Sequence, residues 1–230
     1  MARKIRGGGV AALAAALVFG AMTGPARAED PSKKTRKEQK EIGEAAAERT
    51  LYVGKLALFD AKQIALGNMA LEKSQNPEVR AFAQKLVDDR RQHVSDLKTW
   101  ADAKSIEVAN IDLSQPGTAT GGAGRTDESS APPAMREGYN EKMKGVDERL
   151  DKAITEAEKD LDKLREKNGK DFDKAFLSHV ADGSKKGQSL VKEGQQTYRS
   201  DGAFSALLSQ TRQGIEREET QAKALEKHVR

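Results

Sequence analysis

Apolar side chains recur along this chain at alternating steps of four and three residues, and this spacing limits what the chain can fold into. The clearest stripe is formed by Tyr52, Leu56, Phe59, Gln63, Leu66 and Ala70. Steps of four and three keep side chains on one face of an α-helix, whereas a strand needs steps of two. The pattern predicts an all-α protein, and its several long runs favour an antiparallel bundle of four to five helices.

Turn signals predict where these helices begin and end. Asn76 and Pro77 are typical of a helix start, because asparagine caps free N–H groups and proline at the first position loses no needed hydrogen bond. The short connection there makes residues 50–104 an antiparallel hairpin of two helices. Three further helices are expected within residues 134–230 and should complete the bundle; they span about 134–167, 171–199 and 201–227.

Two segments lack the helical spacing. Residues 29–49 are highly charged and are predicted to be a solvated lead-in that becomes helical toward its end, with a disordered spacer as the alternative. Residues 105–133 gather Gly, Ser, Thr and Pro, which disfavour both a core and regular backbone. A flexible, disordered linker between the helices is therefore expected there.

The N-terminus has the layout of a secretory signal peptide, predicted over residues 1–28. Basic residues at positions 3, 4 and 6 precede an apolar run from Val10 to Met22, and small residues end the segment at Ala28. A membrane-spanning helix needs about 20 apolar residues, so we expect cleavage after Ala28 rather than an uncleaved anchor. The protein is then expected in the periplasm or secreted, with no transmembrane segment after cleavage.

Cleavage would also change the net charge, and with it the kinds of partner that the protein is expected to bind. The chain has 40 Lys and Arg against 36 Asp and Glu, and four of the basic residues but none of the acidic ones lie in residues 1–28. The remaining chain is neutral, so nucleic acid is not expected as a partner. The chain has no cysteine, which excludes disulfides, thiol catalysis, zinc–thiolate sites and lipid attachment at cysteine.

Compact catalytic motifs do not occur in the sequence. It contains no phosphate-binding glycine loop, no nucleophile elbow and no His-Glu-x-x-His zinc motif. We therefore expect neither enzymatic activity nor a cofactor. The charged helix over 134–167 carries about three heptads, so it is expected to pack in the bundle, with self-association or a protein partner as the alternative.

Two stretches carry a family resemblance. Residues 56–97 contain the asparagine-proline hinge followed by V-x-x-F-A, and residues 169–193 contain F-D-x-A followed by an aromatic residue. Together with residues 203–225, they resemble a large family of exported bacterial proteins with a ferritin-like four-helix fold, catalogued as a domain of unknown function. The resemblance implies inward-pointing Glu, Asp and His side chains like the metal site of ferritin-like bundles.

Four positions depart from the pattern that this resemblance implies. The expected Glu is Gln63, and the three expected His positions read Arg90, Ser184 and Glu218. Glutamine is a poor metal ligand and arginine keeps its positive charge, so a di-metal oxidase is not expected. His93, His179 and Glu218 remain as ligand types, and a metal-binding ferritin-like protein with a remodelled site is the alternative function.

The replacements suggest an interior polar cluster in place of a metal site. Its candidate members are Gln63, Arg90, His93, His179, Ser184 and Glu218. In this hypothesis Arg90 supplies the positive charge, pairs with Glu218 and donates to Gln63. Alternatively, a rotated helix places Arg90 and Glu218 at the rim, where both meet water. The expected function is a non-catalytic envelope protein with a binding, structural or stress-related role and an unknown partner.

Overall fold

Five helices make up the described part of the chain. The structure is a computed structural model that describes residues 31–114 and 131–229. Its helices are α1 (Pro31–Lys73), α2 (Pro77–Asp102), α3 (Pro133–Arg165), α4 (Gly169–Thr197) and α5 (Gly202–His228). No strand occurs in these two ranges, so the predicted all-α bundle is confirmed. The predicted signal peptide, residues 1–28, lies outside the described residues.

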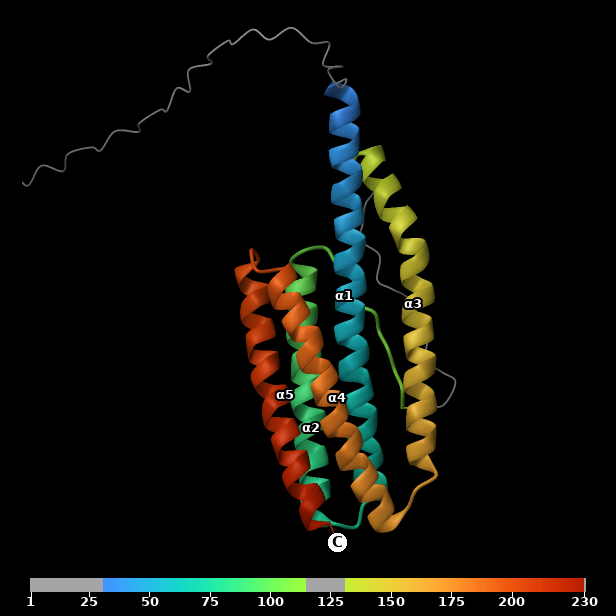
Figure 1. Cartoon of the computed structure of the whole chain (residues 1–230), viewed down its shortest axis with the longest axis vertical. Coiled ribbons are helices and arrows are strands. Elements are labelled where there is room, and N and C mark those ends of the chain that lie inside the picture. The colour runs from blue at the N-terminus through green and yellow to red at the C-terminus, as the bar shows by residue number, and fades with distance from the viewer. Residues whose placement is uncertain (1–30, 115–130, 230) are drawn as a thin grey trace, which may run out of the picture.

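Four of these helices form the bundle, and α3 packs on its outside (Figure 1). α1 contacts α2 and α4, and α5 contacts α4 and α2, whereas α3 lies mainly along α1. α4 and α5 complete the four-helix arrangement, and α3 covers the outer face of α1, with its buried side chains in the same core cluster as those of α1, α2 and α4. α1 presents a second face to α3, where Gly54 lies against Leu150, and this face covers the apolar stripe of α3.

α1 begins at Pro31, well before the expected helix start at Thr50. The segment expected to be a charged lead-in, 29–49, is therefore helical from residue 31 onward. Its few apolar residues suffice because α3 packs against them: Ala47 is fully buried.

Two glycines bring the N-terminal parts of α1 and α3 together. A Cβ atom on Gly43 or on Gly138 would overlap a backbone carbonyl oxygen of the opposite helix, so both positions need glycine for this close approach. In Figure 1 these parts of α1 and α3 extend beyond the other helices. We call residues 31–48 and 133–145 the α1–α3 arm.

The first part of the predicted linker packs against the helices. Residues 105–114 have no helix or strand and run alongside α1 and α3 (Figure 1). Ile106, Ala109 and Leu113 are buried there, so this part differs from the flexible linker that we expected over 105–133. Apolar side chains at these positions cover core surface that would otherwise meet water. Residues 115–130 lie outside the described residues.

The turn between α1 and α2 has the predicted cap. Oδ1 of Asn76 accepts hydrogen bonds from the backbone N–H groups of Glu78, at 2.9 Å, and Val79, at 3.3 Å. Pro77 occupies the first helical position, where its missing N–H costs nothing. The cap fixes the point where the chain reverses, and so sets which residues of α1 and α2 face each other. Across the described ranges, no helix is long and apolar enough to cross a membrane.

Candidate functional site

A group of charged side chains lies in the interior of the four-helix bundle. It consists of Asp60 from α1, Arg90 and His93 from α2, and Glu218 from α5. Asp60 is fully buried, and the most exposed of the four, His93, keeps 7% of its surface in contact with solvent. We call these four residues the buried charge cluster.

Arg90 is the centre of the buried charge cluster. Its Nε and Nη2 atoms donate to Oε1 of Glu218, at 3.1 and 2.5 Å, and its Nη1 atom lies 3.5 Å from Oδ1 of Asp60. Its guanidinium carbon also lies 5.4 Å from the ring centre of Phe59, within the range of a cation–π contact. One side chain therefore joins α1, α2 and α5. Arg90 is only 2% exposed, so the pair with Glu218 lies in the interior and not at the rim.

His93 shares the Asp60 carboxylate with Arg90. Its Nδ1 atom lies 2.6 Å from Oδ2 of Asp60. An ionised carboxylate can only accept hydrogen bonds, so Nδ1 is the donor in this contact. Asp60 therefore holds Arg90 with one oxygen and the imidazole with the other, which fixes the orientation of the His93 ring.

Burial and charge pairing act against each other in the cluster. Burial alone would lower the pKa of Arg90, but the attraction of Glu218 and Asp60 outweighs it, so the pKa is raised and Arg90 stays charged. Burial raises the pKa of Glu218, and the contact with Arg90 opposes that shift. Removing one partner from such a buried pair costs about 3–5 kcal/mol of stability, because a charge is left uncompensated.

The other three predicted members of the interior cluster lie at its edge or away from it. Gln63 and Ser184 are buried on α1 and α4, and the amide nitrogen of Gln63 fills the space where a Cβ atom on Gly183 would lie. Nη1 of Arg90 meets Asp60 instead of the predicted Gln63. His179 is only half-buried, so it takes no part in the buried charge cluster.

Asp60 is the cluster member that the sequence analysis missed. The stripe was drawn through Phe59, which is only half-buried, whereas the buried line of α1 passes from Leu56 through Asp60 to Gln63. A signal was present, because Asp60 lies four residues after Leu56 and three before Gln63, which is helical spacing on the same face. A carboxylate at that position was a candidate partner for Arg90.

Comparison with known protein families gives one match. The family described as a domain of unknown function, DUF4142, matches residues 34–131 and 133–225. This chain belongs to the DUF4142 family. Comparisons with curated proteins and with solved structures give no match.

The interior of this DUF4142 chain does not fit the metal site that the resemblance implied. The Arg90 guanidinium lies between the Asp60 and Glu218 carboxylates, so a cation near them would meet a fixed positive charge. In the described ranges, no three His, Asp or Glu side chains come together as a set of metal ligands. The side chains that could bind a metal are instead used to bind Arg90.

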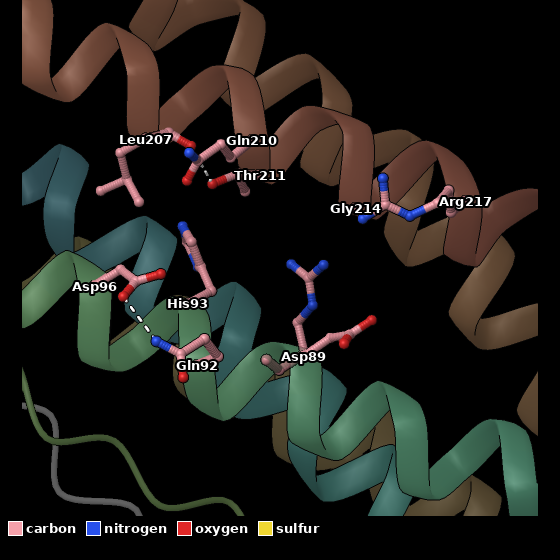
Figure 2. Close-up of a pocket in the computed structure, with 10 residues that line it drawn as sticks. Asp89, Gln92, His93, Asp96, Leu207, Gln210, Thr211, Gly214 and Arg217 are labelled. Atoms are coloured by element: carbon pink, nitrogen blue, oxygen red, sulfur yellow. Dashed lines mark hydrogen bonds between the residues drawn. The ribbon is translucent and has the colours of Figure 1, made fainter.

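A small pocket opens next to the buried charge cluster, between α2 and α5 (Figure 2). Its volume is about 160 Å³, and it is partly open to solvent. Arg90 and His93 of the buried charge cluster are among its lining residues, and the others are Asp89, Gln92, Asp96, Leu207, Gln210, Thr211, Gly214 and Arg217. The cluster is thus closed toward α1 and reachable from the α2–α5 side.

Proposed function

We propose that this chain is an exported, non-catalytic protein of the bacterial cell envelope, built as a ferritin-like bundle with a binding or structural role. The observation that carries the proposal is the position of Arg90 between Glu218 and Asp60 in the interior. A ferritin-like enzyme needs its carboxylates free to bind metal. Here they form ion pairs with an arginine that links three helices.

Export is supported by the sequence of the first 28 residues. Their basic start, apolar run and small-residue ending have the layout of a cleaved signal peptide. The absence of cysteine fits the proposal without being needed for it, since such a bundle is held by packing and ion pairs alone. A periplasmic or secreted location follows if the leader is cleaved after Ala28.

The α1–α3 arm supports a role in binding another protein. It extends beyond the bundle (Figure 1) and carries exposed ion pairs between the two helices, such as Arg36 with Glu137 at 3.0 Å and Lys40 with Glu141 at 2.6 Å. Ile42 lies on it with 54% of its surface exposed. In this proposal Ile42 forms part of the contact with a partner protein or with a second copy of the chain.

The proposal is tested by purifying the protein from the envelope fraction without chelator and measuring its metal content. We expect N-terminal sequencing to begin at Glu29, and iron, manganese, copper and zinc each to be far below one ion per chain. One tightly bound ion per chain would instead support the metal-binding alternative. An intact N-terminus in the cytoplasmic fraction would contradict export.

The proposed contact through the α1–α3 arm is tested by mild crosslinking of the same preparation. Ile42→Asp should reduce the crosslinked product, because a charge would be buried at the contact. Ala224→Asp, at an exposed residue of α5 outside the arm, serves as the matched control. Equal crosslinking of both variants would argue against a contact at Ile42.

A further inference from the structure

Two atoms of the buried charge cluster have no partner, and both can accept a hydrogen bond. Nε2 of His93 and Oε2 of Glu218 are buried and have no hydrogen-bond partner among the described residues. In a neutral imidazole one nitrogen donates and the other accepts; Nδ1 of His93 donates to Asp60, so Nε2 accepts. Buried polar atoms are almost always paired. The cluster therefore lacks a hydrogen-bond donor.

The charges of the cluster leave it one positive charge short. With a neutral imidazole, the two carboxylates of Asp60 and Glu218 face a single guanidinium, that of Arg90. The guanidinium is thus matched, and one negative charge remains in the interior. A buried charge is costly unless an opposite charge lies close to it. A cation that donates hydrogen bonds would supply both the missing charge and the missing donor.

The part of the α2–α5 pocket next to His93 is lined by further acceptors. The Thr211 hydroxyl donates its proton to the carbonyl of Leu207, at 2.8 Å, so its lone pairs remain for a ligand. Asp96 accepts a hydrogen bond from Gln92, at 2.8 Å, and an ionised carboxylate can accept several. Both residues line the pocket together with His93. Three acceptors, one of them fully charged, thus gather at this end of the pocket.

Arg217, an exposed cation that lines the pocket, lies toward its other end. It is six residues beyond Thr211 on α5, about 9 Å further along the helix axis. Figure 2 shows Arg217 and Gly214 on one side of the pocket and His93 and Asp96 on the other. At such a separation, the interaction between charges in contact with solvent is largely screened by salt. Arg217 therefore leaves the His93 end open to a cation.

We propose that the His93 end of the pocket binds a small primary amine in its ammonium form. Its three N–H groups donate to Nε2 of His93, to the Thr211 hydroxyl and to the Asp96 carboxylate, and its alkyl group packs against Leu207. A volume of about 160 Å³ equals roughly five water molecules at 30 Å³ each, which suits an ammonium group with two or three carbons. The site goes beyond the proposed function and is independent of it, because neither metal content nor export enters the argument.

The three histidines of the chain allow a direct test by NMR. The purified protein is titrated with ethylammonium chloride at constant ionic strength and about pH 8, where an ordinary histidine is neutral. The imidazole nitrogens are followed in a long-range ¹H–¹⁵N spectrum. We expect a saturable shift of Nε2 of His93, with a Kd below about 10 mM, and no saturable shift at His179 or His228. Before ligand is added, Nε2 of His93 should carry no proton.

Two further probes separate the effect of the N–H donors from the effects of charge and size. Tetramethylammonium carries the same charge as ethylammonium but has no N–H group. Ethanol has a similar size but no charge. Each should bind at least about tenfold more weakly than ethylammonium, because charge-assisted hydrogen bonds are about twice as strong as neutral ones.

A matched pair of variants on α2 locates the site. Asp96→Asn should weaken ethylammonium binding by about tenfold, since the charge that pairs with the ammonium group is lost. Asp88→Asn is the control and should leave binding unchanged. Asp88 likewise accepts from a glutamine one turn earlier, Gln84 at 3.0 Å, but it does not line the pocket. Both carboxylates lie at least partly in contact with solvent, so both variants are expected to fold.

Four outcomes would overturn the proposal. The first is the absence of a saturable shift at His93 up to about 50 mM ethylammonium. The second is a proton on Nε2 of His93 in the free protein, because an imidazolium cannot accept a hydrogen bond. The third is equal or tighter binding of tetramethylammonium or ethanol. The fourth is equal loss of binding in the Asp96→Asn and Asp88→Asn variants.

Discussion

The guanidinium of Arg90 lies 2.5 Å from the carboxylate of Glu218, across the interface between α2 and α5 and out of contact with bulk water. The two residues are 128 positions apart, so this ion pair ties the hairpin of α1 and α2 to the hairpin of α4 and α5. Such pairs are costly to bury and are sensitive to the loss of either partner. The buried charge cluster therefore favours one packing arrangement of the bundle over others.

The helix cap at Asn76 gives a first prediction. Asn76→Ala should lower the free energy of unfolding by about 1 kcal/mol, because its side chain accepts two backbone N–H groups of α2. The matched control is Asn168→Ala, since Asn168 also precedes a helix but its side chain makes no capping hydrogen bond. Urea unfolding followed by circular dichroism measures both. Equal losses in the two variants would contradict the role of the cap.

The close approach of α1 and α3 gives a second prediction. Gly138→Ala should open the α1–α3 arm, because its Cβ atom would overlap the backbone of α1. Amide hydrogen exchange should then become faster in residues 31–48 and 133–145. Gly145→Ala on the same helix is the control: its Cβ atom meets only the flexible end of Arg149 at 3.8 Å. That variant should gain up to about 1 kcal/mol from helix propensity, and faster exchange in it would count against the explanation.

The pH dependence of stability follows from His179. Burial, with a smaller contribution from Lys62, lowers its pKa below the ordinary value of 6.5, while Asp160 and Asp182 oppose the shift. Below pH 6.5 the unfolded chain therefore binds a proton more readily than the folded one. The stability that this histidine contributes is present above pH 6.5 and is lost as the pH falls toward the folded-state pKa.

Thermal unfolding between pH 5 and 7.5 measures this effect. His179→Gln should flatten the dependence in that range, whereas the exposed His228→Gln should leave it unchanged. An unchanged slope in the His179 variant would show that other groups cause the pH dependence.

Local patterns in the sequence were enough to predict the helices that form the bundle. The steps of four and three residues predicted helices in each segment where one is found, and Asn76 and Pro77 marked the reversal between α1 and α2. The start of α1 was not predictable in this way. Residues 31–49 carry few apolar side chains of their own, and their helix is stabilised by contact with α3, which lies about 100 residues further along the chain.

The pair of Arg90 with Glu218 in the interior cluster was predictable from the sequence, but the second partner of Arg90 was not. Arg90 and Glu218 interrupt apolar stripes, and this interruption is visible in the sequence. The position of His179 was not, because α4 has a broad apolar face, and its buried line passes through Phe176 and Val180. A rotation of α4 about its own axis, smaller than the angle between neighbouring residues, decides whether the His179 imidazole faces the core. The choice of Asp60 over Gln63 as the partner of Arg90 depends on the same kind of rotation in α1.

The measurement that tests the account most directly is a double-mutant cycle on Arg90 and Glu218, read out as the free energy of unfolding in urea. Arg90→Met alone should cost about 3–5 kcal/mol, since Glu218 loses its partner in the interior. Adding Glu218→Leu should restore part of this loss, with a coupling of about 2 kcal/mol or more. The exposed pair Arg212 and Glu216 on α5, changed to Met and Leu, should couple by less than about 1 kcal/mol. Small, additive effects at Arg90 and Glu218 would contradict the account.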